Sequence, residues 1–248
     1  MPLSRRSFLV TAAAAGLAAC SRAAHRVTSR PQPAGTTAAP TLPALPPGPA
    51  AAVYFGPRDG KSVALTFHGS GDPSLTQELL AEAARLRVPI TVFAVGTWLE
   101  QHPDMSRRIL AAGHELENHT YTHPSLAGAP AVKVAEECRR CRDVLAAQTG
   151  SGGRYFRPSG IEGHYSQVIL AQAGDNGYAT VVGFDVDPLD YQDPGSAAII
   201  ARVRRALRPG SIVSLHLGHA GTVAAFPTIV TDVRSRGLEP VLVRDLLA

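Results

Sequence analysis

Short apolar runs alternate with amphipathic segments along residues 51–248. The apolar runs are rich in β-branched and aromatic residues, which favour strands that are covered on both faces. Strands are therefore expected at residues 62–67, 90–95, 114–118, 155–156, 179–184 and 211–215.

Helical periodicity fills the intervals between these runs. Leu75, Leu79 and Ala83 recur at the four-residue spacing of one helix face within residues 74–87, and a second helical pattern covers residues 130–148. This alternation of strands and helices predicts an α/β fold with a parallel sheet or barrel. In such folds the chemistry gathers at the carboxyl ends of the strands.

The N-terminus has the pattern of an export signal. Arg5 and Arg6 precede an apolar run at residues 8–19, which is too short to span a hydrocarbon core of about 30 Å. A signal peptide is therefore expected over residues 1–19. The paired arginines resemble the twin-arginine export signal, and the Leu-Ala-Ala-Cys sequence that ends at Cys20 resembles a bacterial lipobox, in which Cys20 is lipidated. The alternative is an ordinary signal peptide with a chance cysteine.

Residues 20–50 are rich in proline, alanine and threonine, with seven prolines between positions 31 and 49. A polyproline-like spacer rises about 3.1 Å per residue, so this tether can hold a domain up to roughly 90 Å from a membrane. We expect an exported cell-membrane lipoprotein whose catalytic domain, residues 51–248, faces the cell wall. An inert leftover of processing is the alternative for the tether.

The charge distribution excludes a nucleic-acid partner. The chain has 24 basic and 20 acidic residues, but the first 50 residues contribute five arginines and no acid, which leaves 19 bases and 20 acids for residues 51–248. That balance provides no basic face. We expect a monomer that is attached to the membrane by its lipid anchor.

Cys138 and Cys141 lie within the helical pattern at residues 130–148. Three cysteines are too few for a disulfide scaffold, and a thioredoxin-like pair opens a helix rather than lying in its middle. A surface disulfide or two unpaired thiols is expected here instead of a redox site.

Polar residues follow several of the expected strands. His119 and His123 are four residues apart, so on a helical turn they would share one face and could bind one zinc-like ion. His216 follows the strand at residues 211–215. Surface or structural roles are expected for the other histidines of this part of the chain: His102, His114, His164 and His219.

Charged residues follow two further strands. Asp185, Asp187 and Asp190 come after residues 179–184, and Arg157 follows the short strand at residues 155–156. A plain buried ion pair between Arg157 and one of these carboxylates is the structural alternative to a catalytic role.

Five short motifs, taken in order, resemble the polysaccharide deacetylases of carbohydrate esterase family 4, the NodB homology domain. The motifs are Thr66-Phe67-His68-Gly69 in place of T-F-D-D, His119-Thr120-x-x-His123, Arg157-Pro158-Ser159-Gly160, Asp187-x-x-Asp190-Tyr191 and Leu215-His216. The resemblance covers residues 52–248 and implies a distorted (β/α) barrel. It also implies metal-dependent removal of N- or O-acetyl groups from peptidoglycan or a chitin-like polysaccharide.

The resemblance assigns roles to individual residues. His119 and His123 would bind a divalent ion, expected to be zinc, which polarises the acetyl carbonyl. His216 would be the general acid toward the sugar amine, with Asp187 holding its imidazole. Arg157 would orient the residue at the general-base position. The implied substrate-binding residues are Tyr191, which replaces a family tryptophan in the acetyl pocket, Pro158 and Gly160.

The first motif departs from the family pattern. The family has a general-base aspartate and a metal-binding aspartate where this chain has His68 and Gly69. His68 can act as a third metal ligand, or as the base if Arg157 keeps it neutral. Asp72 can bend back to supply a carboxylate, although a turn or helix-start role is preferred for it.

Two functions are consistent with these motifs. An active metal-dependent deacetylase is preferred, because the second motif, His216, Asp187 and Arg157 are all present. A catalytically inactive deacetylase-like lipoprotein that binds glycan is the alternative, because both first-motif carboxylates are absent.

Overall fold

The computed structural model describes residues 48–248. The predictions of a signal peptide over residues 1–19, of lipidation at Cys20 and of most of the tether concern residues outside this range. Within residues 48–248, no helix is both long and apolar enough to cross a membrane.

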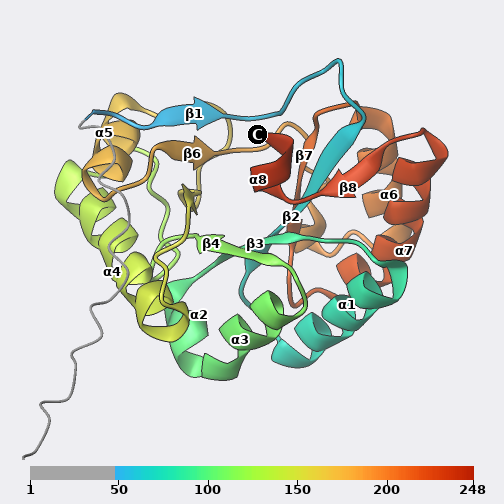
Figure 1. Ribbon diagram of the computed structural model, residues 1–248, viewed down its shortest axis with the longest axis horizontal. Coiled ribbons are helices and arrows are strands. Elements are labelled where there is room, and N and C mark those ends of the chain that lie inside the picture. The colour runs from blue at the N-terminus through green and yellow to red at the C-terminus, as the bar shows by residue number, and fades with distance from the viewer. Residues whose placement is uncertain (1–47) are drawn as a thin grey trace, which may run out of the picture. The chain divides into compact units, whose positions relative to one another are not determined.

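Parallel strands curl into a half-barrel (Figure 1). The strands are β1 (Ala51–Val53), β2 (Ser62–Gly69), β3 (Thr91–Ala94), β4 (Glu115–Asn118), β5 (Tyr155–Phe156), β6 (Thr180–Val182), β7 (Ile212–His216) and β8 (Glu239–Val241). Their order is β1-β6-β5-β4-β3-β2-β7, and β8 pairs with the first residues of β2. A parallel bridge between Val186 and Val213 links the segment after β6 to β7. The predicted distorted α/β barrel is therefore confirmed.

Helices cover the outer side of the strands, except for the short C-terminal helix α8 (Figure 1). They are α1 (Pro73–Leu86), α2 (Gly96–Gln101), α3 (Pro103–Ala111), α4 (Ala131–Thr149), α5 (Gln167–Asp175), α6 (Ser196–Ala206), α7 (Ala220–Ser235) and α8 (Val243–Leu246), with a 3₁₀ turn η1 (Asp190–Gln192). The helices predicted at residues 74–87 and 130–148 correspond to α1 and α4. Each predicted strand likewise contains or overlaps an observed one.

Alternation along β2 divides its side chains between two environments. Val63, Leu65 and Phe67 belong to the large apolar core shared with the helices. Ala64 lies instead in a smaller cluster within the barrel, and His68 shares that inward direction because successive side chains of a strand point to opposite faces. An apolar strand can therefore direct a polar residue at its carboxyl end into the barrel.

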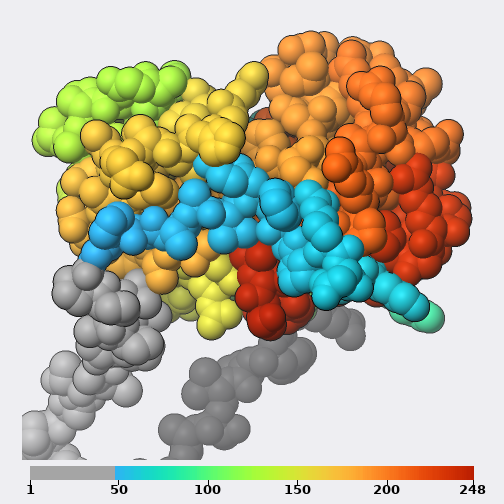
Figure 2. Space-filling model, turned by 90° about the horizontal axis from the view of Figure 1, so that it is seen from above, coloured from blue at the N-terminus to red at the C-terminus, as the bar shows by residue number. Residues whose placement is uncertain are grey.

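The C-terminal helix α8 closes the amino end of the barrel. Val243 and Leu246 pack against Ala64 and Ile212, which lie near the starts of β2 and β7. Seen from above, the segment that contains β1 crosses the domain and lies beside these C-terminal residues (Figure 2). A Cβ on Gly56 would come within 2.6 Å of the Leu246 side chain, so this approach requires glycine. The carboxyl ends of the strands are left to form the site.

Candidate active site

A cavity of about 620 Å³ opens at the carboxyl ends of the strands. Side chains from β2, β7 and the loops that follow β4, β5 and β6 line it. The lining residues are His68, Ser70, His123, Pro158, Gly160, Ile161, Glu162, Phe184, Asp187, Tyr191, Ser214, His216 and His219. The three residues predicted to bind substrate, Tyr191, Pro158 and Gly160, are among them.

Three histidines converge beside this cavity, and two of them, His68 and His123, line it. His68, His119 and His123 each present a ring nitrogen, and these atoms lie within 4.8 Å of one another. His68 Nδ1 and His119 Nε2 are 2.7 Å apart. His119 Nδ1 donates to the carbonyl oxygen of Arg157 at 2.7 Å, which leaves the lone pair of Nε2 facing the cluster. The predicted grouping of the three histidines is thus present.

The segment that carries His119 and His123 is a loop, so the prediction of a helical turn was wrong. Thr120 and His123 both have left-handed backbones, with φ of 69° and 58°. The carboxylate of Glu137, on α4, accepts the backbone N–H groups of Tyr121 at 2.9 Å and Thr122 at 2.7 Å. These contacts stabilise the loop because they give hydrogen-bond acceptors to two of its backbone N–H groups.

His68 is held from its other side by β7 and by Arg157. Ser214 Oγ lies 2.9 Å from His68 Nε2, and Arg157 Nη1 lies 3.4 Å from it. Burial, followed by the neighbouring His119 and His216, lowers the pKa of His68 well below its usual value. Burial similarly lowers the pKa of His119. Both imidazoles are therefore neutral near pH 7 and able to offer lone pairs.

Arg157 is buried without an acidic partner. It donates to the carbonyl oxygens of Val182 and Gly183, both at 3.0 Å, and to Thr66 Oγ1 at 2.9 Å. Its guanidinium lies 4.0 Å from the centre of the Phe93 ring. Burial lowers the pKa of Arg157 to about 10. Among residues 48–248 it forms no ion pair, so the alternative of a pair with Asp187 or Asp190 is wrong.

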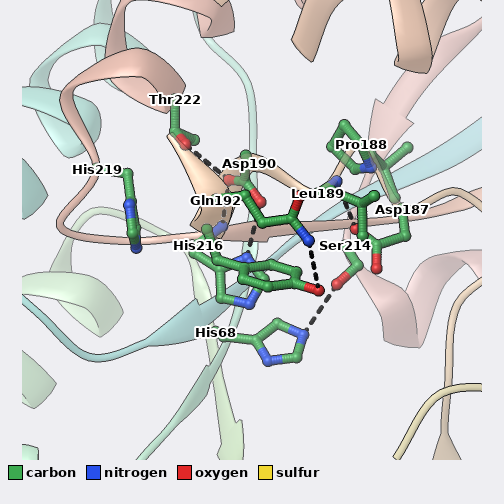
Figure 3. A network of polar contacts seen from close by, with 12 residues as sticks. His68, Asp187, Pro188, Leu189, Asp190, Gln192, Ser214, His216, His219 and Thr222 are labelled. Carbon is green, nitrogen blue, oxygen red and sulfur yellow. Dashed lines mark hydrogen bonds and ion pairs between the residues drawn. The ribbon is translucent and has the colours of Figure 1, made fainter. Parts of the chain in front are cut away.

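The carboxylate that contacts His216 is Asp190, not Asp187 as the sequence suggested (Figure 3). Asp190 Oδ1 is 2.8 Å from His216 Nδ1, and Oδ2 accepts the backbone N–H of His216 at 2.8 Å and the Thr222 hydroxyl at 2.6 Å. The left-handed backbone of Leu189 and the 3₁₀ turn η1 direct Asp190 inward under β7.

Asp187 is three residues before Asp190 in the chain, and it lines the cavity. It accepts the backbone N–H of Leu189 at 2.8 Å, and burial raises its pKa. Both aspartates belong to one sequence motif. The backbone turn at Leu189, which lies between them, places Asp190 and not Asp187 against His216.

Asp72 has the helix-start role that the sequence favoured. Its Oδ1 accepts the backbone N–H of Ser74 at 2.7 Å, and Pro73 follows as the first residue of α1. It is not part of the histidine cluster.

Within residues 48–248, Cys138 and Cys141 form no disulfide and are free thiols, and both are buried in α4. Burial raises the pKa of each, which opposes thiolate chemistry. Of the two outcomes expected, unpaired thiols are found, although not at the surface.

His219, for which a surface or structural role was expected, lines the cavity and contacts Asp193. Ser214 and Glu137 were not singled out from the sequence. For Ser214 the signal was its place two residues before His216 on one strand, since side chains at i and i+2 share a face. Glu137 gave no signal, because its contacts join segments that are distant along the chain.

Known proteins resemble this chain in sequence and structure. The family model for polysaccharide deacetylase matches residues 55–181. A chitooligosaccharide deacetylase of Bradyrhizobium sp. (strain ANU 289) is 38% identical over 195 residues, which cover 72% of this chain and 87% of the relative. A peptidoglycan-N-acetylglucosamine deacetylase of Bacillus cereus is 28% identical over 195 residues, with 77% and 90% covered.

A solved structure has the same architecture. The wild-type pseudoenzyme of carbohydrate esterase family 4 from Bacillus anthracis superimposes with a TM-score of 0.75 and 25% sequence identity. The match covers 82% of this chain and 70% of that one.

Proposed function

We propose that this chain, which belongs to the polysaccharide deacetylase family, is a metal-dependent hydrolase that removes N-acetyl groups from a cell-wall or surface polysaccharide. The observation that supports this most directly is the convergence of His68, His119 and His123 on one point, beside His216 with its aspartate. The relatives described as acting on chitooligosaccharide and peptidoglycan suggest glycans of N-acetylglucosamine as substrates.

The three imidazoles suit a zinc ion. Three histidines with an open fourth position are a known catalytic zinc set, and neutral nitrogen donors match its preference. The Nε2–H of His68 can donate a hydrogen bond to Ser214 Oγ, which leaves Nδ1 as the ligand atom. When bound, the ion supplies Lewis-acid polarisation of the acetyl carbonyl. We therefore assign His68 as a ligand rather than as the base.

His216 is placed to act as the general acid. Asp190 accepts a hydrogen bond from the Nδ1–H of His216, so Nε2 is the atom left to deliver a proton to the departing nitrogen. Hydrolysis forms a bond from the water oxygen to the acetyl carbon and breaks the carbon–nitrogen bond, which gives acetate and a free sugar amine. A neutral leaving amine requires this proton, because an amide anion is a poor leaving group.

Asp187 is the proposed proton acceptor for the attacking water. It lines the cavity, and within residues 48–248 its one hydrogen bond is to Leu189. Burial raises its pKa, and this brings a carboxylate closer to the range of an effective base near pH 7. Asp187→Asn is expected to abolish acetate release while leaving metal content unchanged.

Metal content and acetate release test the proposal together. We expect the purified chain to bind a divalent ion and to release acetate from N-acetylglucosamine oligomers. His68→Ala is expected to weaken metal binding by at least the roughly 10- to 100-fold that follows loss of an outer-shell partner. His102→Ala, which changes a histidine outside the cavity lining, is the control. If His68→Ala retained the metal and lost turnover, His68 would be the base instead.

The inactive alternative is favoured by one comparison. A pseudoenzyme of the same family shares this architecture, and His68 and Gly69 occupy the positions of both family carboxylates. If the wild-type chain bound oligomers but bound no divalent metal and released no acetate, a glycan-binding role would replace the enzymatic one.

We also propose that the chain is exported and acts while anchored to a membrane by lipidated Cys20. The sequence of residues 1–20 and the proline-rich tether support this placement. A domain held away from a membrane by such a tether can reach glycan strands of a surrounding wall.

A further inference from the structure

A second histidine–aspartate pair, His219 with Asp193, lies near the first. Figure 3 shows His219 on the same side of the network as His216 and Asp190. His219 Nδ1 is 2.9 Å from Asp193 Oδ1, and the centres of the His219 and His216 rings are 6.1 Å apart. Each member stands three residues after its counterpart, so Asp190 and Asp193 come from one segment and the two histidines from another. In the inner pair, His216 with Asp190, the aspartate is fully buried. The outer pair, His219 with Asp193, is more exposed and lies at the rim of the cavity.

The outer pair leaves one hydrogen-bonding atom free toward the cavity side. His219 lines the cavity, with 26% of its side chain exposed, while the Asp193 side chain is 68% exposed. A carboxylate only accepts, so Nδ1 is the donor and neutral His219 keeps its lone pair at Nε2. In the part of the chain that the structure describes, Nε2 has no hydrogen-bond partner.

The backbone holds both members of this pair in place. Gly218, with φ of 80°, packs so closely that a Cβ there would lie 2.6 Å from the backbone nitrogen of Asp72. The His219 carbonyl oxygen accepts the N–H of Thr222 at 3.1 Å at the start of α7. The backbone N–H of Asp193 donates to the Asp190 carbonyl at 2.9 Å. The backbone positions of both residues are therefore held by local hydrogen bonds and close packing.

An exposed aromatic ring lies on the same side of the cavity. Tyr191 is 39% exposed, and its ring centre is 5.1 Å from that of His216. Among the large apolar side chains exposed in residues 48–248, it is the one that lines the cavity. A pyranose has an apolar face that can pack on such a ring and hydroxyl groups that need polar partners.

We propose that His219, oriented by Asp193, is a glycan-binding residue on the leaving-group side of the site. Its Nε2 accepts a hydrogen bond from a sugar hydroxyl, while Tyr191 packs against a sugar ring. The inference rests on the proposed function, because protonation of the amine by His216 requires the sugar to lie on this side. His219 is about one sugar ring farther out, so it selects for chain length rather than taking part in the chemistry.

The test compares His219→Ala, Asp193→Asn and Asp193→Ala with the wild-type chain and the control His102→Ala. Binding of N-acetylglucosamine oligomers, from monomer to tetramer, is measured by calorimetry on zinc-loaded protein, together with kcat and KM for acetate release. We expect His219→Ala to weaken tetramer binding about three- to tenfold, as for loss of one hydrogen bond, and to raise KM equally. Its kcat is expected to stay within about twofold, and monomer binding is expected to change less.

The conservative variant separates positioning from a general structural effect. Asparagine can still accept a hydrogen bond from the Nδ1–H of His219 through its amide oxygen, so Asp193→Asn is expected to bind the oligomers nearly as well as wild type. Asp193→Ala has no such acceptor and is expected to lose as much oligomer binding as His219→Ala.

Equal oligomer binding by His219→Ala and wild type would overturn the proposal. So would a loss of kcat with binding unchanged, because that result would place His219 in the chemistry. If the wild type bound oligomers but released no acetate, the proposed hydrolase function would be wrong. The comparison of oligomer binding between wild type and His219→Ala would still test the role of His219. If the wild type bound no oligomer, this inference would be wrong.

Discussion

Replacing Gly69 with aspartate would supply the carboxylate that the resemblance to the family implies at this position, yet we expect it to damage the domain instead of completing a metal site. Gly69 pairs with Ala94 across β2 and β3. A Cβ at position 69 would lie 2.9 Å from Ala94 Cα and 2.9 Å from Val92 Cγ1. Because β2 alternates, this direction is opposite to that of His68 and leads into the apolar core that contains Val92 and Ala94.

The expected size of the effect follows from this crowding. Adding a methyl group to a packed core costs typically 1–3 kcal/mol, and a buried carboxylate without a partner costs several kcal/mol more. A domain of about 200 residues changes its Tm by roughly 2–4 °C for each kcal/mol. Gly69→Ala is therefore expected to lower the Tm by about 2–12 °C. Gly69→Asp is expected to lower it further, with no gain in metal affinity.

Thermal unfolding followed by circular dichroism, with metal content measured in parallel, provides the assay. Gly60→Ala is the matched control, because a Cβ there would meet its nearest neighbour only at 3.9 Å and φ is not positive. If Gly69→Asp were as stable as wild type and bound metal more tightly, the assumed side-chain direction at position 69 would be refuted.

Three further predictions concern a loop, a buried histidine and the anchor. Glu137→Ala is expected to weaken metal binding by roughly 10- to 100-fold, because the loop between His119 and His123 loses its acceptor. Lys133→Ala removes only the exposed partner of Glu137 and is the control; equal affinity in both variants would contradict the prediction. Burial lowers the pKa of His114, and among residues 48–248 its Nε2 has no hydrogen-bond partner. The unfolded chain therefore binds more protons, and the free energy of unfolding falls as pH drops below about 6.5. In urea titrations from pH 7.5 to 5, His114→Leu is expected to lose less of this free energy than wild type, and parallel profiles would exclude the effect. Cys20→Ala is expected to leave the membrane fraction of the native host, and full retention there would argue against the lipid anchor.

Many strands and helices of the fold were predictable because the sequence patterns that indicate them are local. The apolar run from Val63 to Phe67 indicates a covered strand wherever it is placed, and the Asp72-Pro73 pair favours a helix start by its own chemistry. Motif order also brought His68, His119 and His123 into one predicted site, since strand ends of a parallel sheet meet at one edge.

The choice between Asp187 and Asp190 was not available from the sequence. Both are aspartates after the same strand, and spacing alone does not distinguish them. The left-handed residue Leu189, which is not a glycine, turns the chain so that Asp190 passes beneath His216. Left-handed backbones at Thr120 and His123 likewise replaced the expected helical turn.

The sequence by itself determined the alternation of strands and helices, the inward direction of alternate strand residues and the residue types that collect at the strand ends. Those properties depend on side-chain chemistry and on periods of a few residues. Tertiary structure alone decided which aspartate holds His216, that Glu137 supports the histidine loop and that His219 lines the cavity. These are contacts between segments far apart in the chain, and their geometry depends on backbone dihedrals and packing that no local pattern encodes.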